Sequence, residues 1–175
     1  MEITVEKYTN VDLMRKACAK TMHKKRSNAS LSSIYRCEHS PARTQMFWIE
    51  MNDIPTFVSV HFVRHKFGVE HFVTSNRDDR GGDQKVDRNT PVDHGMWVNA
   101  QSLIFMARKR LCLCAHTKTV EVMRLIVEGV RKVDPELAEL MVPECVYRGF
   151  CPEIRSCGYV NTEECKNLLD KYRLR

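Results

Sequence analysis

The chain is organised around residues 61–80, HFVRHKFGVEHFVTSNRDDR, which follow directly on an apolar run. This stretch holds three histidines, three arginines and a lysine. Guanidinium, imidazole and hydroxyl groups all donate hydrogen bonds to phosphate oxygens and to polar heterocycles. Their density predicts a site for a phosphorylated ligand that carries a polar ring.

The residues at the start of this stretch fit two kinds of secondary structure. Pro55 suits the first turn of a helix, with Asp53 as its cap, whereas the β-branched side chains of residues 57–63 favour a strand. We predict a helix over residues 55–66. On a helix, three polar side chains at i, i+3 and i+4 share one face: His61, Arg64 and His65. A strand would send the last two to opposite sides.

The segments before this helix alternate between strand and helix patterns. The predicted elements are a strand at Ile3–Tyr8, a helix at Leu13–Met22 capped by Asp12, and a buried strand at Thr44–Met51. Residues 23–33 are basic and rich in Ser and Asn, which indicates a loop. Asn52-Asp53 predicts a turn.

The segments after it are mainly helical. Residues 76–95 predict a long polar loop. A helix from Asn99 to about Cys114 carries one stripe of side chains: Asn99, Leu103, Met106, Arg110 and Cys114. A second helix begins at Thr119, and its predicted core face is Met123, Ile126, Val127 and Val130. A short helix covers Pro135–Leu140, and an Asn161/Glu164 capping box starts a last helix that runs to about Tyr172.

Length and composition are typical of a soluble globular protein with one domain. The chain has 175 residues, of which 43% are hydrophobic and 29% charged, and a net charge of +6. This positive excess fits an anionic partner. No apolar run reaches the roughly 18 residues of a membrane span, and the N-terminus lacks the layout of a signal peptide. We therefore expect a cytoplasmic protein with no membrane partner.

A cytoplasmic location implies that the eight cysteines are reduced thiols or metal ligands. One group gathers near the C-terminus: Cys145, Cys151, Cys157 and Cys165. Zinc requires tetrahedral thiolates, and the short Cys-x2-Cys unit of zinc knuckles is absent. We predict no metal site but thiols that pack a Cys-rich loop at residues 143–160, before a C-terminal helix at 161–175. Zinc stays the alternative. Cys112 and Cys114 are predicted to lie in a helix and in the core.

Four motifs, taken in order, resemble the flavin-dependent thymidylate synthases, the ThyX family. The matching segments are Glu38-His39-Ser40-Pro41, Arg64-His65-Lys66, Ser75-Asn76-Arg77 and Asn99-Ala100-Gln101-Ser102-Leu103 continuing to Arg110. The family has His-Glu-Thr-Pro, Arg-His-Arg, Ser-Gly-Arg and Asn-Ala-Arg-Ser-Leu at these places. The match covers roughly residues 38–130.

The resemblance implies a fold and a reaction. It implies an α+β (α/β) domain over residues 1–175, with a small central sheet flanked by long helices, assembling as a homotetramer. It implies transfer of a one-carbon unit from methylenetetrahydrofolate to dUMP, giving dTMP, with reduced FAD as hydride donor and NADPH as reductant. The cofactor then carries the difficult step, while the protein binds and polarises the reactants.

The resemblance also implies a role for each matching residue. FAD contacts are implied for Ser40, Arg64, His65, Lys66, Asn99 and Gln101. Contacts to dUMP are implied for His61, Arg64, Ser75, Asn76, Arg77 and Arg110. Among the latter, the Ser-Asn-Arg segment would hold the phosphate, and Arg110 would be the catalytic residue that stabilises charge on the uracil ring.

Departures from the family motifs leave a second enzymatic function as an alternative. Lys66 and Gln101 replace arginines, a glutamate before the family serine is missing, and the segment from Arg77 to Asn99 is short. Arg88 matches the nucleotide-binding arginine of that segment by position only. The alternative is an enzyme of FAD and a pyrimidine nucleotide with a different one-carbon product.

Some of the same residues also have purely structural explanations. Residues 64–66 alone also fit a solvated helix end, Asn99 fits a helix cap, and Arg110 fits a surface charge. A basic, Cys-rich nucleic-acid-binding module would use Lys24, Lys25, Arg26, Arg108, Lys109 and Arg110. Aromatic residues are only 8% and do not alternate with these basic runs, so we expect no nucleic-acid partner.

Overall fold

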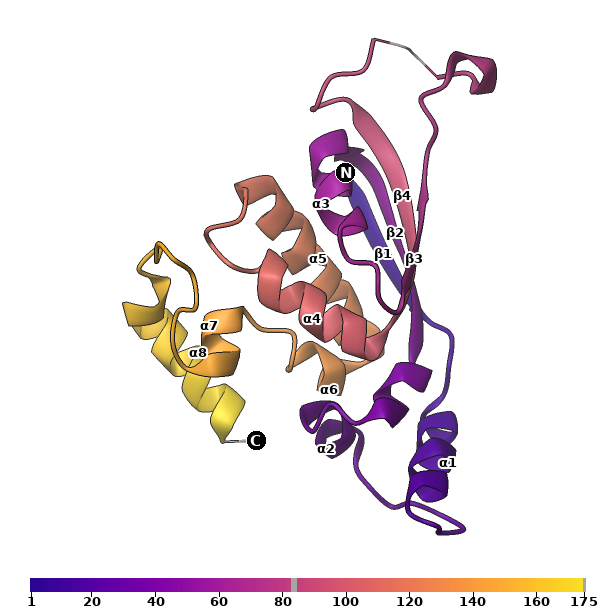
Figure 1. The fold of residues 1–175 in the computed structure, drawn as a ribbon, viewed down its shortest axis with the longest axis vertical. Helices are drawn as coiled ribbons and strands as arrows, with labels where there is room; N and C mark the ends of the chain where they lie inside the picture. Colours follow the sequence, from indigo (N-terminus) through magenta and orange to yellow (C-terminus); the bar gives the residue numbers. More distant parts are fainter. Residues whose placement is uncertain (83–84, 175) are drawn as a thin grey trace.

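A small antiparallel sheet forms the centre of the molecule. The computed structural model describes residues 1–82 and 85–174, in which four strands pair in the order β1-β2-β4-β3. They are β1 (Glu2–Lys7), β2 (Met46–Pro55), β3 (Val69–Val73) and β4 (Pro91–Asn99). Helices α3 (Thr56–Val63) and α5 (Thr117–Val133) pack on one face, and α4 (Ala100–Arg110) packs against α5 (Figure 1). The predicted small sheet with flanking helices is therefore confirmed.

Alternation along β2 decides which face of the sheet is covered. Phe47, Ile49 and Met51 are fully buried toward the helices. Trp48 points to the opposite face, where it lies over Gly95 of β4. A Cβ atom at Gly95 would come within 2.7 Å of the Trp48 ring. Glycine is therefore required in this strand by packing rather than by a turn.

Strand β2 continues through the predicted turn at Asn52-Asp53, so that prediction is wrong. The register shifts between Met51 and Ile54, which marks a β-bulge. Asp53 takes a φ of +60° in the bulge, and its N–H donates to Asp93 Oδ1 at 3.0 Å. A bulge accommodates the extra residue without ending the strand.

Strands β3 and β4 lie on either side of the long loop and differ from the prediction. The polar loop predicted for residues 76–95 is wrong from Pro91 onward, because β4 begins there. Residues 83 and 84 of that loop lie outside the described residues. Strand β3 was not predicted, and the short 3₁₀ turn η2 (Asp78–Arg80) follows it. Both strands carry polar side chains that find partners inside the fold.

The helices near the centre agree with the sequence, but their ends differ. Helix α3 is shorter than predicted, and Pro55 rather than Asp53 takes the N-cap position, without a side-chain cap. Helix α4 ends at Arg110, so Cys112 and Cys114 are not helical, and Cys114 is exposed rather than in the core. The predicted core face of α5 is confirmed as buried: Met123, Ile126, Val127 and Val130.

The N-terminal helices also depart from prediction. Asn10, not Asp12, caps α1 (Val11–Thr21), because its side chain accepts from the Leu13 N–H at 3.1 Å. Helix α2 (Leu31–Arg36) begins inside the predicted loop 23–33, with Ser30 as its cap. The 3₁₀ turn η1 (Ser40–Thr44) then leads into β2.

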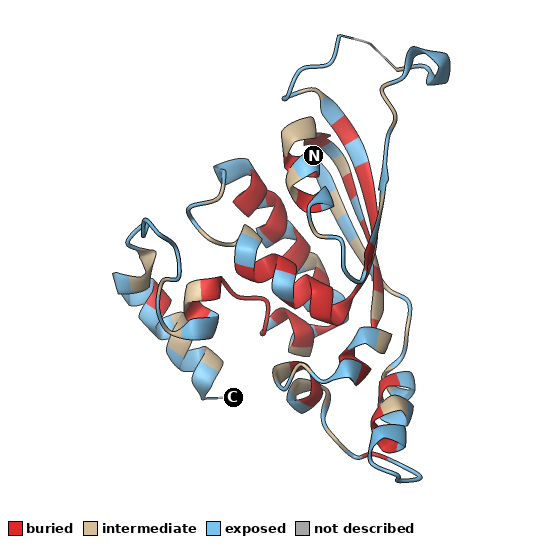
Figure 2. Ribbon diagram, viewed as in Figure 1, coloured by how far each residue is buried: buried red, intermediate tan, exposed pale blue. Residues whose placement is uncertain are grey.

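The C-terminal part forms an arm beside α4 and α5 (Figure 1). Helix α6 (Pro135–Ala138) packs against α5 and α2, and the arm itself consists of α7 (Glu144–Arg148), η3 (Tyr159–Asn161) and α8 (Glu163–Arg173). Helix α7 interrupts the predicted Cys-rich loop. Thr162 rather than Asn161 caps α8, through the Cys165 N–H, and residue 175 of the predicted helix lies outside the described residues. Figure 2 shows that α8 is mostly exposed, unlike α5.

Candidate functional site

Arg110 joins the ends of helices α3 and α4. It is the last residue of α4 and is partly buried. Its Nε donates to His65 Nε2 at 2.9 Å, and its Nη2 donates to the His61 carbonyl at 2.6 Å. Two of the five N–H groups of a guanidinium are thus used inside the chain. The remaining N–H groups can serve a ligand.

His65 is neutral because of its surroundings. Burial lowers the pKa of His65 to about 4, with smaller contributions from the charges of Arg110 and His71. The bond from Arg110 requires a lone pair on Nε2, so the proton lies on Nδ1. Burial and the neighbouring Arg64 also lower the pKa of Arg110 from its ordinary value. A neutral imidazole here holds Arg110 without adding to the local positive charge.

His61 anchors a second group of side chains that the sequence did not reveal. Its Nδ1 lies 2.8 Å from Thr119 Oγ1 of α5. Arg88 stacks over Phe57 at 4.9 Å, and the His116 ring lies 4.5 Å from the same phenyl ring. Burial lowers the pKa of His61, and the charges of Arg110, His116, Arg64 and Arg88 lower it further. The charges of these side chains therefore act together around His61.

Arg88 reaches this cluster through the backbone. The Phe57 N–H at the start of α3 donates to the Arg88 carbonyl at 3.0 Å, which fixes the end of the long loop on the helix. The position of Arg88 in the chain was the only sequence signal for it. His116, the N-cap of α5, gave no signal.

The arginines of this cluster are not paired with acids among the described residues. None of Arg64, Arg88 and Arg110 forms an ion pair with a carboxylate among residues 1–82 and 85–174. Like charges gathered in this way repel one another and attract anions. The cluster of Arg64, Arg88 and Arg110, called the arginine cluster below, is therefore a region of uncompensated positive charge.

The turn of residues 64–68 brings further predicted residues alongside α4. The Asn99 N–H donates to the Gly68 carbonyl at 3.0 Å, and Ser102 Oγ donates to the Phe67 carbonyl at 2.6 Å. Gly68 has φ +67°, and a Cβ there would lie 2.1 Å from Asn99 Nδ2. The turn thus runs beside α4 with Lys66 exposed and Phe67 92% exposed.

Asn99 itself is the N-cap of α4. Its side chain accepts from the Ser102 N–H at 2.9 Å. Gln101 is buried, and its Oε1 accepts from Arg43 Nε at 2.8 Å. Ser40 begins η1, which packs on α4. These residues lie at the N-terminal end of α4, roughly 16 Å along the helix axis from Arg110 at ~1.5 Å per residue.

The predicted phosphate segment lies elsewhere in the chain. Ser75, Asn76 and Arg77 follow β3, in the loop that Figure 1 draws at the far end of the sheet from α4. Arg77 pairs with Asp79, through Nε at 2.8 Å and Nη2 at 2.6 Å, and is mostly exposed. Within one chain this segment does not join the arginine cluster.

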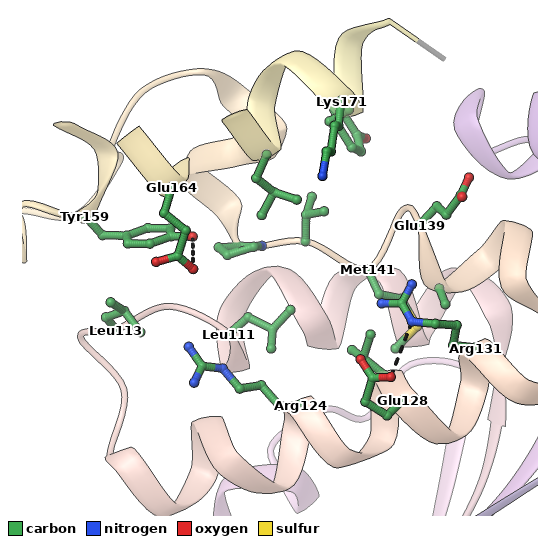
Figure 3. Close-up of a pocket in the computed structure, with 16 residues that line it drawn as sticks. Leu111, Leu113, Arg124, Glu128, Arg131, Glu139, Met141, Tyr159, Glu164 and Lys171 are labelled. Carbon is green, nitrogen blue, oxygen red and sulfur yellow. Dashed lines mark hydrogen bonds and ion pairs between the residues drawn. The ribbon is translucent and has the colours of Figure 1, made fainter. Parts of the chain in front are cut away.

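A cavity of about 400 Å³ lies between α5 and α8, away from these residues. Figure 3 shows apolar side chains such as Leu111 and Met141 in its wall and charged ones at its rim. Arg131 pairs there with Glu128 at 3.4 Å. None of the predicted site residues lines this cavity.

The cysteines do not form a metal centre in the part of the chain that the structure describes. No group of three or more His, Cys, Asp or Glu residues there could hold a metal ion. Burial and the neighbouring Cys165 thiol raise the pKa of Cys145 to about 12, so it carries its proton. Separately, among these same residues, none of the helices combines the length and hydrophobicity needed to cross a membrane.

In three dimensions the chain is similar to solved thymidylate synthases of one fold. Thymidylate synthase X from Helicobacter pylori, with FAD and dUMP, matches with a TM-score of 0.67 at 12% identity, over 81% of this chain and 99% of that one. A second structure of that enzyme with FAD and dUMP also gives 0.67 at 12% identity, over 81% and 100%.

A methylase shares the same fold. PolB from Streptomyces cacaoi, a UMP/dUMP methylase bound with 5-Br dUMP, matches with a TM-score of 0.59 at 13% identity, over 85% of this chain and 96% of that one. No protein-family model matches the chain, and no curated protein matches it in sequence. At these identities the comparisons show a ThyX-like fold.

Proposed function

We propose that the chain is a flavin-dependent enzyme that methylates dUMP, a thymidylate synthase of the ThyX kind. The observation that carries the proposal is the arginine cluster at the ends of α3 and α4, which has no acidic partner among the described residues. The shared fold with dUMP enzymes supports it. Methylenetetrahydrofolate is the proposed one-carbon donor and NADPH the reductant.

The residues beside α4 fit FAD. Arg64 and Lys66 supply cations for a pyrophosphate, and the exposed Phe67 ring, at 92% exposure, offers an aromatic face beside them. Asn99 and Gln101 are already engaged in the helix cap and with Arg43, so we assign them to shaping the turn and η1 rather than to direct recognition. When bound, FAD supplies the hydride that completes the methyl group.

Arg110 is the proposed catalytic residue. The guanidinium is held at two points by His65 and the His61 carbonyl, which leaves its other N–H groups free to face a uracil carbonyl. Negative charge that develops on the ring would meet a donor already in position, so little reorganisation is needed in the transition state. Arg88 and Arg64 would raise the local potential for the nucleotide.

We propose that Ser75, Asn76 and Arg77 serve the cluster of a second copy in a homotetramer. They follow β3 in the loop that Figure 1 draws at the far end of the sheet from α4, and Arg77 is exposed. Co-expression of Arg77→Ala and Arg110→Ala chains tests the idea. Mixed oligomers should regain part of the activity that each variant lacks. A monomer by light scattering, or mixed oligomers as inactive as the two parents, would overturn the shared site.

The main experiment follows flavin and product together. Purified protein should be yellow, and with FAD, NADPH, methylenetetrahydrofolate and dUMP it should give a product with the mass of dTMP. A colourless protein that takes up neither FAD nor dUMP would refute the proposal. An Arg80→Ala variant, altered at an exposed residue outside the arginine cluster, is the matched control.

The second candidate is a related enzyme with a different one-carbon product or substrate. The likeness to PolB, a UMP/dUMP methylase, is the observation that favours it. Offering UMP and dUMP in parallel separates the two, because a methylated ribonucleotide would identify the second activity. A nucleic-acid-binding module is disfavoured, because Arg108 is 6% exposed and Arg110 is turned inward, which leaves Lys109 as the exposed member of that basic run.

A further inference from the structure

Three side chains behind His65 form a hydrogen-bonded chain across three elements. Ser59 of α3 lies 3.0 Å from His94 Nδ1 of β4, and His94 Nε2 lies 2.9 Å from His71 Nδ1 of β3. His71 Nε2 then lies 2.7 Å from the His65 carbonyl. Ser59 and His94 are 3% and 0% exposed. This arrangement crosses from the helix layer through the sheet to the turn that carries His65.

The carbonyl at one end fixes the position of one proton. A carbonyl oxygen only accepts, so His71 must carry a proton on Nε2. When Nε2 carries the only ring proton of His71, its Nδ1 accepts from the Nε2–H of His94, and His94 accepts on Nδ1 from the Ser59 hydroxyl. Every polar atom in the chain is satisfied without a charge. This suits a buried location, where an ion would be costly.

The position of Ser59 excludes a role as a nucleophile. Its hydroxyl proton is committed to His94, as in a Ser-His pair, but the oxygen lies inside the core and is 3% exposed. A substrate carbonyl could not approach it. The contact must therefore serve structure around the site rather than acyl transfer.

His65 is held from both sides by this arrangement. Its carbonyl accepts from His71 of the sheet, and its imidazole accepts from Arg110 of α4. The backbone and the side chain of one residue thus connect β3 to the guanidinium of the arginine cluster. If the bond at the carbonyl is lost, the backbone of His65 keeps only the bond of its N–H to the Phe62 carbonyl, so the acceptor for Arg110 can shift.

We propose that His71 and His94, supported by Ser59, are positioning residues that orient Arg110 for its ligand by fixing His65. The ligand meant here is dUMP, and this identity rests on the proposed function. The hydrogen-bond chain itself belongs to the free protein. No other described group bonds to the His65 ring, so the effect of this chain on Arg110 runs through His65.

The test compares two substitutions at His71. His71→Phe keeps a flat ring but removes both hydrogen bonds, whereas His71→Gln keeps one donor and one acceptor. The first should weaken dUMP affinity roughly fivefold to tenfold, the equivalent of one hydrogen bond, and the second should restore most of it. His23→Gln, at an exposed histidine, is the control and should match the parent.

Nitrogen NMR of the ligand-free protein gives the readout that a general loss of stability would not reproduce. His71 and His94 should both be Nε2–H tautomers, and His65 the Nδ1–H tautomer. His71→Phe should shift the His65 and Arg110 Nε signals, and His71→Gln should return them. An Nδ1–H tautomer at His71 or His94, or His65 signals unmoved by His71→Phe, would overturn the proposal. Absence of dUMP binding by the parent, with these tautomers present, would instead refute the proposed function.

Discussion

Glu38 and Arg108 form the most deeply buried ion pair near the site, and removing it should be costly. Arg108 Nη2 and Nη1 both donate to the Glu38 carboxylate, the second at 3.4 Å, and the Arg108 side chain is 7% exposed against 18% for Glu38. The guanidinium also lies 3.4 Å from the centre of the Tyr147 ring. Arg108 Nε has no hydrogen-bond partner among the described atoms. The carboxylate is thus the counter-charge of a buried cation.

The two single substitutions should lower the free energy of unfolding by different amounts. Glu38→Gln leaves a buried cation, for which losses of about 3–5 kcal/mol are typical. The Tyr147 ring still offsets part of this charge, so we expect about 3 kcal/mol. Arg108→Met leaves Glu38, which is partly exposed and can reach water, so about 1–2 kcal/mol is expected. The double variant should resemble Arg108→Met, because the uncompensated cation is then gone.

Urea unfolding followed by circular dichroism measures these values. For a chain of this size, about 3 kcal/mol corresponds to a fall of roughly 6–12 °C in Tm. Glu38→Gln should also disturb the candidate site, because the Glu38 carbonyl accepts a hydrogen bond from Gln101 at 3.4 Å, near Ser40. Glu38→Gln within about 1 kcal/mol of the parent, or less harmful than Arg108→Met, would refute the assignment of a buried, uncompensated charge.

The remaining predictions concern the site and its supports. Arg110→Ala should keep flavin absorbance but lower turnover by roughly 10²-fold or more, and unchanged dTMP formation would remove it from catalysis. Arg77→Ala should weaken dUMP binding by roughly tenfold or more, as for a lost charged hydrogen bond, whereas an unaltered Kd in titration calorimetry would count against the phosphate role. Burial and His71 lower the pKa of His94 to about 4, below the ordinary 6.5, so the unfolded chain takes up the proton first. Stability is then complete above about pH 6.5 and falls as pH approaches 4, by up to about 1.4 kcal/mol per pH unit, and a urea midpoint constant from pH 7 to 5 would contradict this. Gly68→Ala meets φ +67° and an Asn99 contact at 2.1 Å and should cost about 2–3 kcal/mol in urea unfolding, more than Gly158→Ala, where φ is +83° but the space is open; equal losses would show that the contact is harmless.

The helices could be predicted because their signals are local. Pro55 at the start of α3 and the spacing of apolar residues in α5 act within a few residues, and the structure keeps both elements. Arg110 shares the predicted α4 stripe with apolar residues, and in the structure it turns toward His65. The capping of α4 by Asn99 was one of the two interpretations that its residue type and position left open.

Strands β3 and β4 could not be predicted because their signals are long-range. In β4, His94 and Gly95 resemble loop residues. His94 is buried because Ser59 and His71 satisfy both ring nitrogens, and Gly95 is required by Trp48. None of these partners is adjacent in sequence. For the same reason Arg88 was not recognised as part of the cluster: the loop end must first pair with α3.

Repulsion within the arginine cluster links its stability to a ligand. Arg64, Arg88 and Arg110 approach one another without carboxylates, and the lowered pKa values of His61 and His65 keep these histidines from adding charge. The fold therefore tolerates the cluster by using neutral hydrogen-bond acceptors, a carbonyl and an imidazole, where a purely structural arginine would have an acid. An acid in that place would occupy the hydrogen-bond donors of Arg110 and cancel the positive potential that attracts an anion. An anion that binds here would relieve this repulsion and so stabilise the fold. The absence of an ion pair to Arg110 among the described residues is thus the physical reason for proposing a binding site at this end of α4.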